Sequence, residues 1–128
     1  MGMEQLGTWR VSAVARSVPQ LRRALQERIA GRGLDEEAVA LAATEAISNV
    51  VRHAYLRSGP VSLSVQASTE EVLVVVADEG IWARKDTNRN RSSRGIGLAL
   101  IHELCASARI EPTDTGTTVT MRFTTNHG

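Results

Sequence analysis

Alternating and helically spaced apolar residues divide the first third of the chain into predicted elements. Residues 8–16 alternate between apolar and polar side chains, which predicts a first strand. Ser17 stands three residues before Gln20, so a Ser-x-x-Gln capping box is predicted to open the helix that follows. Gly31 and Gly33 are predicted to end this helix.

A second helix is predicted from Asp35, which is placed to cap it, to about Tyr55. At 100° per residue its apolar side chains form one broad arc, and Glu45, Asn49 and His53 follow one another as a polar stripe along the border of that arc. Removing a carboxylate and a carboxamide from water costs free energy unless partners are supplied. The stripe therefore indicates either a solvated helix edge or the wall of a cavity that holds a metal, water or a ligand.

The remaining pattern predicts four strands and one more helix. Residues 61–66 alternate, which predicts a strand with one buried face, and the continuous apolar run at 72–77 predicts a central strand covered on both faces. Residues 81–94 have no periodicity and are interpreted as a basic lid loop. Helical spacing resumes beyond Gly97, and strands are predicted at 108–111 and 118–123. The elements predict one α+β domain over residues 1–128, a two-layer α/β sandwich with about three helices on one face of a mostly antiparallel sheet.

Composition narrows the class of protein. A chain of 128 residues can bury one core, and with only 3% aromatic residues that core must be aliphatic. Cys105 is the single cysteine, which excludes an intrachain disulfide and favours a reducing compartment. The sequence has neither a signal peptide pattern nor an apolar run of membrane-spanning length, so a cytoplasmic protein is predicted. A net charge of +1 provides no general attraction to nucleic acids or anionic membranes.

Four short motifs stand at the ends of the predicted elements, and each alone is a weak signal. They are Glu45-x-x-x-Asn49, Asp78-Glu79-Gly80, Gly95-Ile96-Gly97 and Gly116-Thr117-Thr118. Together they resemble the GHKL superfamily, the Bergerat-fold ATPases shared by gyrase, heat-shock chaperones, histidine kinases and mismatch-repair proteins. The resemblance runs from about Asp35 to Phe123. The compact size, the N-terminal strand and helix, and the segment RGIGLALIHEL are most similar to bacterial anti-sigma-factor serine kinases.

The resemblance implies a site for ATP and Mg²⁺. Asn49 would supply an oxygen to Mg²⁺, and Glu45, one helical turn earlier, would act as the catalytic base that accepts a proton from an attacking hydroxyl. Asp78 would accept a hydrogen bond from the adenine amino group, beside Gly80, whose missing Cβ would let the backbone approach the ring. The other nucleotide-binding residues that the resemblance implies are Arg94, Gly95, Gly97 and Leu98 at the helix start near the phosphates, and Thr117 at the adenine edge.

The resemblance also implies partners. An anti-sigma kinase would bind a sigma factor and phosphorylate a serine or threonine of a STAS-domain anti-anti-sigma protein. It would form a homodimer through its N-terminal strand and helix, near Trp9, Val11 and Leu21, with no direct contact to nucleic acid or membrane.

One departure from the family pattern supports an alternative function. Trp82 stands where the family usually has the second glycine of Asp-x-Gly-x-Gly, and the lid at 81–94 is short. The domain could therefore bind ATP and sequester a regulator without phosphotransfer. A histidine-kinase catalytic domain is disfavoured because no helical hairpin with a phospho-acceptor histidine precedes it. A DNA-binding module is disfavoured because the cations cluster in one loop.

Overall fold

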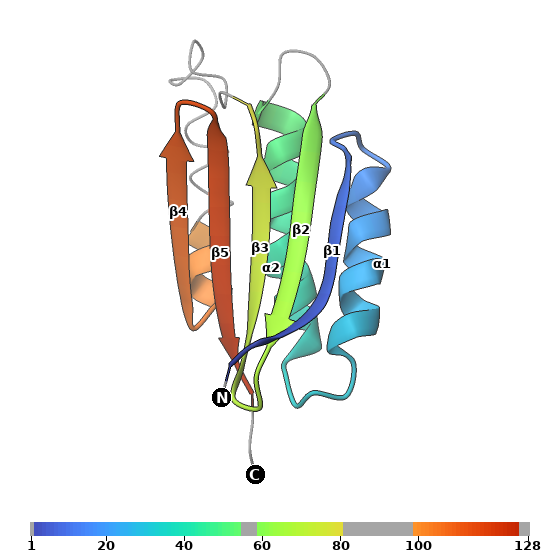
Figure 1. Ribbon diagram of the computed structural model, residues 1–128, viewed down its shortest axis with the longest axis vertical. Coiled ribbons are helices and arrows are strands. Elements are labelled where there is room, and N and C mark those ends of the chain that lie inside the picture. Colours follow the sequence, from blue (N-terminus) through green and yellow to red (C-terminus); the bar gives the residue numbers. More distant parts are fainter. Residues whose placement is uncertain (1, 55–58, 81–98, 126–128) are drawn as a thin grey trace.

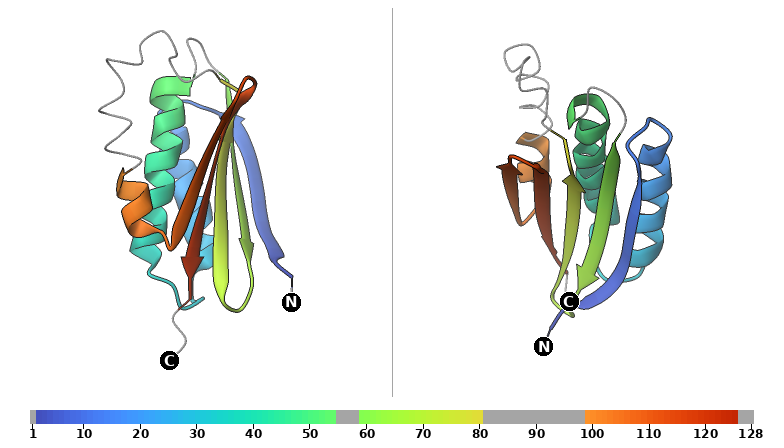
Figure 2. Two further views of the ribbon diagram at one scale, coloured as in Figure 1. Left: turned by 90° about the vertical axis from the view of Figure 1, so that its left-hand side faces the viewer. Right: turned by 45° about the horizontal axis from the view of Figure 1, so that its top comes forward.

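In the computed structural model, which describes residues 2–54, 59–80 and 99–125, helices cover one face of a five-stranded sheet (Figures 1 and 2). The strands are β1 (Glu4–Ser12), β2 (Pro60–Ala67), β3 (Glu71–Asp78), β4 (Ser107–Thr113) and β5 (Gly116–Thr124). Their order is β1-β2-β3-β5-β4, and all neighbours pair antiparallel. The helical segments are α1 (Ser17–Ile29), α2 (Glu36–Asn49), the π-helix η1 (Val50–Ala54) and residues 99–104. This arrangement confirms the predicted α+β sandwich.

The core lies between the helices and the inner face of the sheet, and it is almost entirely aliphatic. Every second residue of β2 and β3 points into it, as the alternation in the sequence requires. Its largest fully buried side chains, each at most 1% exposed, include Leu25, Ile29, Ile47, Leu63, Ile101 and Met121. Within the described residues, no helix is long and apolar enough to cross a membrane.

Strand β3 is covered on one face only, so the prediction that it is covered on both faces is wrong. Its residues alternate strictly between half-buried and buried along the strand. Val75, for example, is half-buried on the outer face, between Ser64 of β2 and Thr120 of β5. A continuous apolar run is typical of a strand buried on both faces, but here the polar neighbours on β2 and β5 make the outer face of the sheet tolerable to water.

The first strand and the start of α1 also differ from the prediction. β1 ends at Ser12, and the chain leaves the sheet where Ala13 donates its N–H to the carbonyl oxygen of Gly59 at 2.7 Å. Ser17 is buried and donates its hydroxyl to the carbonyl oxygen of Ser12. The N-cap residue is Arg16, which makes no side-chain cap. The predicted capping box is therefore wrong, because the Ser17 hydroxyl ties the helix to the strand instead.

The second helix begins as predicted and ends differently. The Asp35 carboxylate accepts the N–H of Ala38 at 3.1 Å, which confirms its capping role. Helical structure continues to Ala54 in the described residues, but after Asn49 it becomes the π-helix η1. The predicted end at Tyr55 lies outside the described residues.

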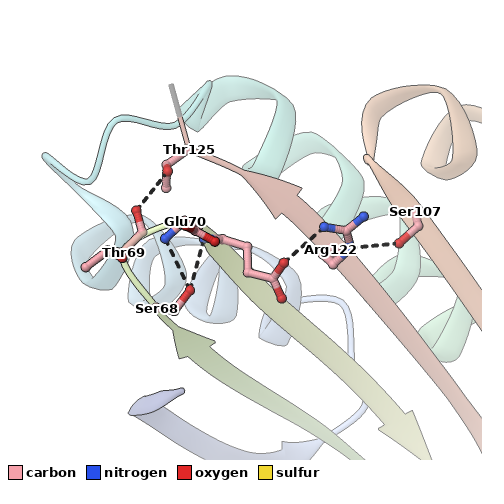
Figure 3. A network of polar contacts seen from close by, with 7 residues as sticks. Ser68, Thr69, Glu70, Ser107, Arg122 and Thr125 are labelled. Atoms are coloured by element: carbon pink, nitrogen blue, oxygen red, sulfur yellow. Dashed lines mark hydrogen bonds and ion pairs between the residues drawn. The ribbon is translucent and has the colours of Figure 1, made fainter. Parts of the chain in front are cut away.

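At the end of the sheet nearest both termini, side chains tie the β2–β3 turn to the neighbouring strands (Figure 3). Ser68 Oγ accepts the N–H of Glu71 at 3.2 Å, and the Glu71 carboxylate pairs with Arg122 of β5 at 3.0 Å. Arg122 also donates to Ser107 of β4 at 3.2 Å. These contacts link three strands at the end of the sheet that lies opposite the candidate site described next.

Candidate functional site

Three elements meet at the end of the molecule drawn at the top of Figure 1, opposite the two termini. They are the end of β3, the start of β5, and η1 at the end of α2. Asp78 pairs in register with Thr117, and both side chains are buried, at 7% and 5% exposed. The antiparallel pairing of β3 with β5 therefore brings together two motifs that lie almost 40 positions apart in the sequence.

The buried carboxylate of Asp78 is oriented by its own loop. Its Oδ1 accepts the N–H of Gly80 at 2.9 Å. An ionised carboxylate has about four lone-pair sites, so this bond leaves Asp78 capacity to accept a further donor such as an amino group. The next residue, Glu79, has a side chain that is 60% exposed and pairs with Arg10 of β1 at 2.7 Å. Of these two carboxylates, Asp78 is the one placed to recognise a ligand.

Two glycines allow backbone segments of the site to approach each other closely. A Cβ on Gly80 would overlap the carbonyl oxygen of Ala54 in η1, and a Cβ on Gly116 would overlap the carbonyl oxygen of Asp78. In both cases the obstacle is backbone, which cannot rotate away. The sequence assigned the missing Cβ of Gly80 to the approach of a nucleotide base, and the structure gives a different reason, which is close contact with the π-helix.

Asn49 and His53 lie deeper than their place in the predicted stripe. They are 0% and 7% exposed, whereas Glu45 is half-buried, so the border position is wrong for Asn49 and His53. The Asn49 Oδ1 accepts a hydrogen bond from Arg52 Nη2 at 3.1 Å, and its Nδ2 has no hydrogen-bond partner. A buried polar atom without a partner is rare, and one explanation for it is a ligand or water that completes the site.

The π-helix explains why extrapolation along the helix misplaced these side chains. In η1 the backbone hydrogen bonds span five residues instead of four, so each residue turns the chain by less than the 100° of an α-helix. The spacing that relates Glu45 to Asn49 therefore does not extend to His53. Short π-helical turns occur frequently at functional sites, but no pattern in this sequence identified one. Arg52 was also missed, although its i+3 spacing from Asn49 permits a contact.

The residues present fit a nucleotide with a magnesium ion. Mg²⁺ prefers oxygen ligands, keeps several waters and takes only one or two protein donors beside substrate phosphates. Within residues 2–54, 59–80 and 99–125, no group of three His, Cys, Asp or Glu side chains is arranged to hold a metal. The Asn49 oxygen therefore fits a metal held mainly by phosphates, and Asp78 and Thr117 fit the polar edge of a base.

Several predicted site residues lie outside the described part of the chain: Trp82, Arg94, Gly95, Gly97, Leu98 and the lid segment 81–94. The helix predicted after Gly97 is present where the structure describes it, at residues 99–104. Ile101 is fully buried, while Leu104 and Cys105 are half-buried and pack against the core. The predicted apolar stripe of this helix is confirmed at these three positions.

Burial makes the Cys105 thiol unreactive, as its predicted core position implies. Removal from water disfavours the thiolate and raises the pKa of Cys105 from its ordinary 9.0 to about 11. We expect alkylation of the native protein at pH 8 to be about ten- to 100-fold slower than alkylation of the urea-denatured chain. Because the unfolded thiol loses its proton first, the free energy of unfolding should fall as pH rises from 9 to 11. Equal alkylation rates in the two states would contradict this.

The Thr44 hydroxyl is a second buried atom of α2 without a hydrogen-bond partner. Replacing it with a methyl group of the same shape removes the desolvation cost without opening a cavity, so Thr44→Val should raise the free energy of unfolding by about 1 kcal/mol. Urea denaturation measures this change. Thr44→Ser is the matched control, because it keeps the hydroxyl and removes the methyl, and it should destabilise. Destabilisation by Thr44→Val would mean that the hydroxyl has a partner.

Of the residues expected near a dimer seam, Leu21 is wrongly placed, because it is 2% exposed and belongs to the core. Trp9 and Val11 are half-buried on β1, which lies at one edge of the described sheet. The guanidinium of Arg28 lies 5.4 Å from the Trp9 ring centre. A shallow cavity at the other end of the molecule, lined in part by Glu4, Arg32, Ala67, Ser68 and Glu70, contains none of the predicted site residues.

Comparisons with known proteins agree with this site. The family model of the histidine kinase-like ATPase domain matches residues 11–123. Comparison with curated protein sequences gives no match. The fold is similar to the crystal structure of the RsbU and RsbW domains of Rv1364c from Mycobacterium tuberculosis, with a TM-score of 0.73 and 23% identity over 95% of this chain and 34% of that one. It is also similar to the Acinetobacter baumannii histidine kinase AdeS, with a TM-score of 0.57 and 15% identity over 95% of this chain and 69% of that one.

Proposed function

Since this chain belongs to the histidine kinase-like ATPase family, we propose that it is an ATP-dependent protein serine/threonine kinase that acts as an anti-sigma factor. The observation that carries the proposal is the meeting of Asn49, Asp78 and Thr117 at one end of the fold. All three side chains are buried, and the Asn49 Nδ2 has no hydrogen-bond partner. Buried polar groups are kept where a ligand completes their hydrogen bonds.

In this proposal each residue has a defined task toward a nucleotide. Asp78 accepts a hydrogen bond from the adenine amino group, and Thr117 contacts the edge of the base. Asn49 gives its oxygen to Mg²⁺, which neutralises phosphate charge when it is bound. Glu45, half-buried one turn before Asn49, accepts the proton of the attacking hydroxyl. The phosphates are bound by Arg94, Gly95, Gly97 and Leu98, at the start of a helix whose amides and dipole favour anions.

The proposed partners are a sigma factor and a STAS-domain anti-anti-sigma protein, whose serine or threonine accepts the phosphoryl group. We further propose a single domain over residues 1–128, a cytoplasmic location, and a homodimer that pairs through β1 near Trp9 and Val11. The structural likeness to a protein with an RsbW domain supports these assignments at the level of fold. The chain spans about a third of the length of that protein, so its activity and partners are proposed for this chain and not transferred to it.

Titration calorimetry tests the nucleotide site directly. Wild type should bind ATP and ADP in the micromolar range, and Mg²⁺ should strengthen the binding. Asn49→Ala should lose the effect of Mg²⁺ and keep metal-free binding, because it removes the metal's protein oxygen. Ser48→Ala, a half-buried neighbour on α2, serves as the control and should behave like wild type. If wild type gives no heat with either nucleotide, the proposed function is wrong.

The second candidate function is sequestration of a regulator without phosphotransfer, and Trp82 in place of a family glycine favours it. The substitution Glu45→Ala separates the two candidates. If the protein is a kinase, Glu45→Ala should lower phosphotransfer to a co-encoded STAS protein by at least about 100-fold and leave partner binding intact. Glu37→Ala, an exposed carboxylate on the same helix, is the control. If Glu45→Ala changes neither phosphate transfer nor output, the protein acts by contact alone.

A further inference from the structure

Arg52 makes a contact that the proposed nucleotide site does not use. It is exposed, it stands in η1 three residues after Asn49, and its Nη2 donates to the Asn49 Oδ1 at 3.1 Å. This oxygen is the atom that the proposed function gives to Mg²⁺. A positively charged group therefore already lies against the metal's protein ligand.

We propose that the Arg52 guanidinium takes the place of Mg²⁺ at Asn49 in the nucleotide-free protein, and that its displacement sets the Mg²⁺ concentration that nucleotide binding requires. This inference rests on the proposed ATP site. Arg52 is in this view a positioning residue, because it acts on the site through the Asn49 side chain and needs no contact with the nucleotide.

The charges and the burial support competition between the two cations. Asn49 is 0% exposed, and Arg52 provides the hydrogen bond that satisfies its oxygen. An arginine is always protonated, so a guanidinium 3.1 Å from this oxygen opposes the approach of a divalent cation to the same atom. Because Arg52 is exposed, its guanidinium is hydrated again once displaced, so the contact is weak enough to be broken.

The test measures ADP binding by calorimetry over a series of Mg²⁺ concentrations, in wild type, Arg52→Gln and Arg23→Gln. Arg23 is an exposed arginine of α1, so Arg23→Gln removes the same charge without touching Asn49. We expect Arg52→Gln to lower the Mg²⁺ concentration for half of the maximal effect by about three- to tenfold, as the loss of one competing hydrogen bond allows. Arg23→Gln should leave it unchanged.

A second measurement needs no nucleotide. In ¹⁵N-labelled protein free of nucleotide and metal, Arg52→Gln should shift the side-chain amide resonances of Asn49, and Arg23→Gln should not. Unshifted resonances in Arg52→Gln would overturn the contact.

Two results from calorimetry would overturn the competition. One is an equal change in Mg²⁺ requirement in both variants, which would be a general charge effect. The other is weaker ADP binding by Arg52→Gln in the absence of Mg²⁺, which would make Arg52 a phosphate contact. Failure of the proposed function is distinguishable from both, because wild type itself would then not bind ADP.

Discussion

Asp78→Asn should lower the affinity for ATP and ADP by about 100-fold while the protein stays folded. The carboxylate of Asp78 is buried and already accepts the N–H of Gly80 at 2.9 Å. An asparagine has a single oxygen to offer, so it cannot face both Gly80 and an adenine amino group as a carboxylate does, and its NH₂ would meet another donor. Leaving such buried groups unpaired costs several kcal/mol, which corresponds to the expected loss.

Glu79→Gln is the matched control for this variant. It removes the same charge at the next position, but the Glu79 side chain is 60% exposed and pairs with Arg10 on β1. Exposed ion pairs contribute little, so its nucleotide affinity should stay within about threefold of wild type. Calorimetry measures affinity, and circular dichroism confirms that both variants are folded. Equal losses in the two variants would show that charge alone, and not the buried carboxylate, determines binding.

Gly80→Ala should destabilise the protein by about 2–4 kcal/mol and lower its melting temperature by about 10 °C. A Cβ at this position would overlap the backbone carbonyl of Ala54, and the nearest other atoms also belong to Ala54. No side-chain rotation relieves this overlap, so either η1 or the end of β3 must move. Because Asp78 Oδ1 is bonded to the Gly80 N–H, nucleotide affinity should fall together with stability.

Gly2→Ala is the control, since a Cβ at Gly2 would have no heavy atom within 4 Å. It should leave the melting temperature and nucleotide affinity unchanged. Thermal unfolding followed by circular dichroism measures the first quantity and calorimetry the second. A Gly80→Ala protein as stable as wild type would mean that η1 yields easily, and the close contact of Gly80 with Ala54 would then not be a constraint on the site.

The sequence by itself determined the layers of the fold and the positions of the motifs. Alternation along β2 and β5 and helical spacing in α2 follow from residue chemistry that repeats locally, so these elements could be predicted with small shifts at their ends. The cap at Asp35 is a local hydrogen bond and was predicted for the same reason. The motifs around Asn49, Asp78 and Thr117 could be recognised because each lies where a predicted element begins or ends.

Only the tertiary structure decided how those ends are arranged. The hydroxyl of Ser17 caps no helix because a strand carbonyl lies closer, and the outer face of β3 is half-buried because its neighbours are polar. The π-helix η1 buries His53, brings Ala54 against Gly80, and carries Arg52, which contacts Asn49. These features depend on contacts between segments far apart in the chain or on a change of helical geometry. A periodicity that assumes one regular helix contains neither, so the sequence pattern located the site and the packing set its geometry.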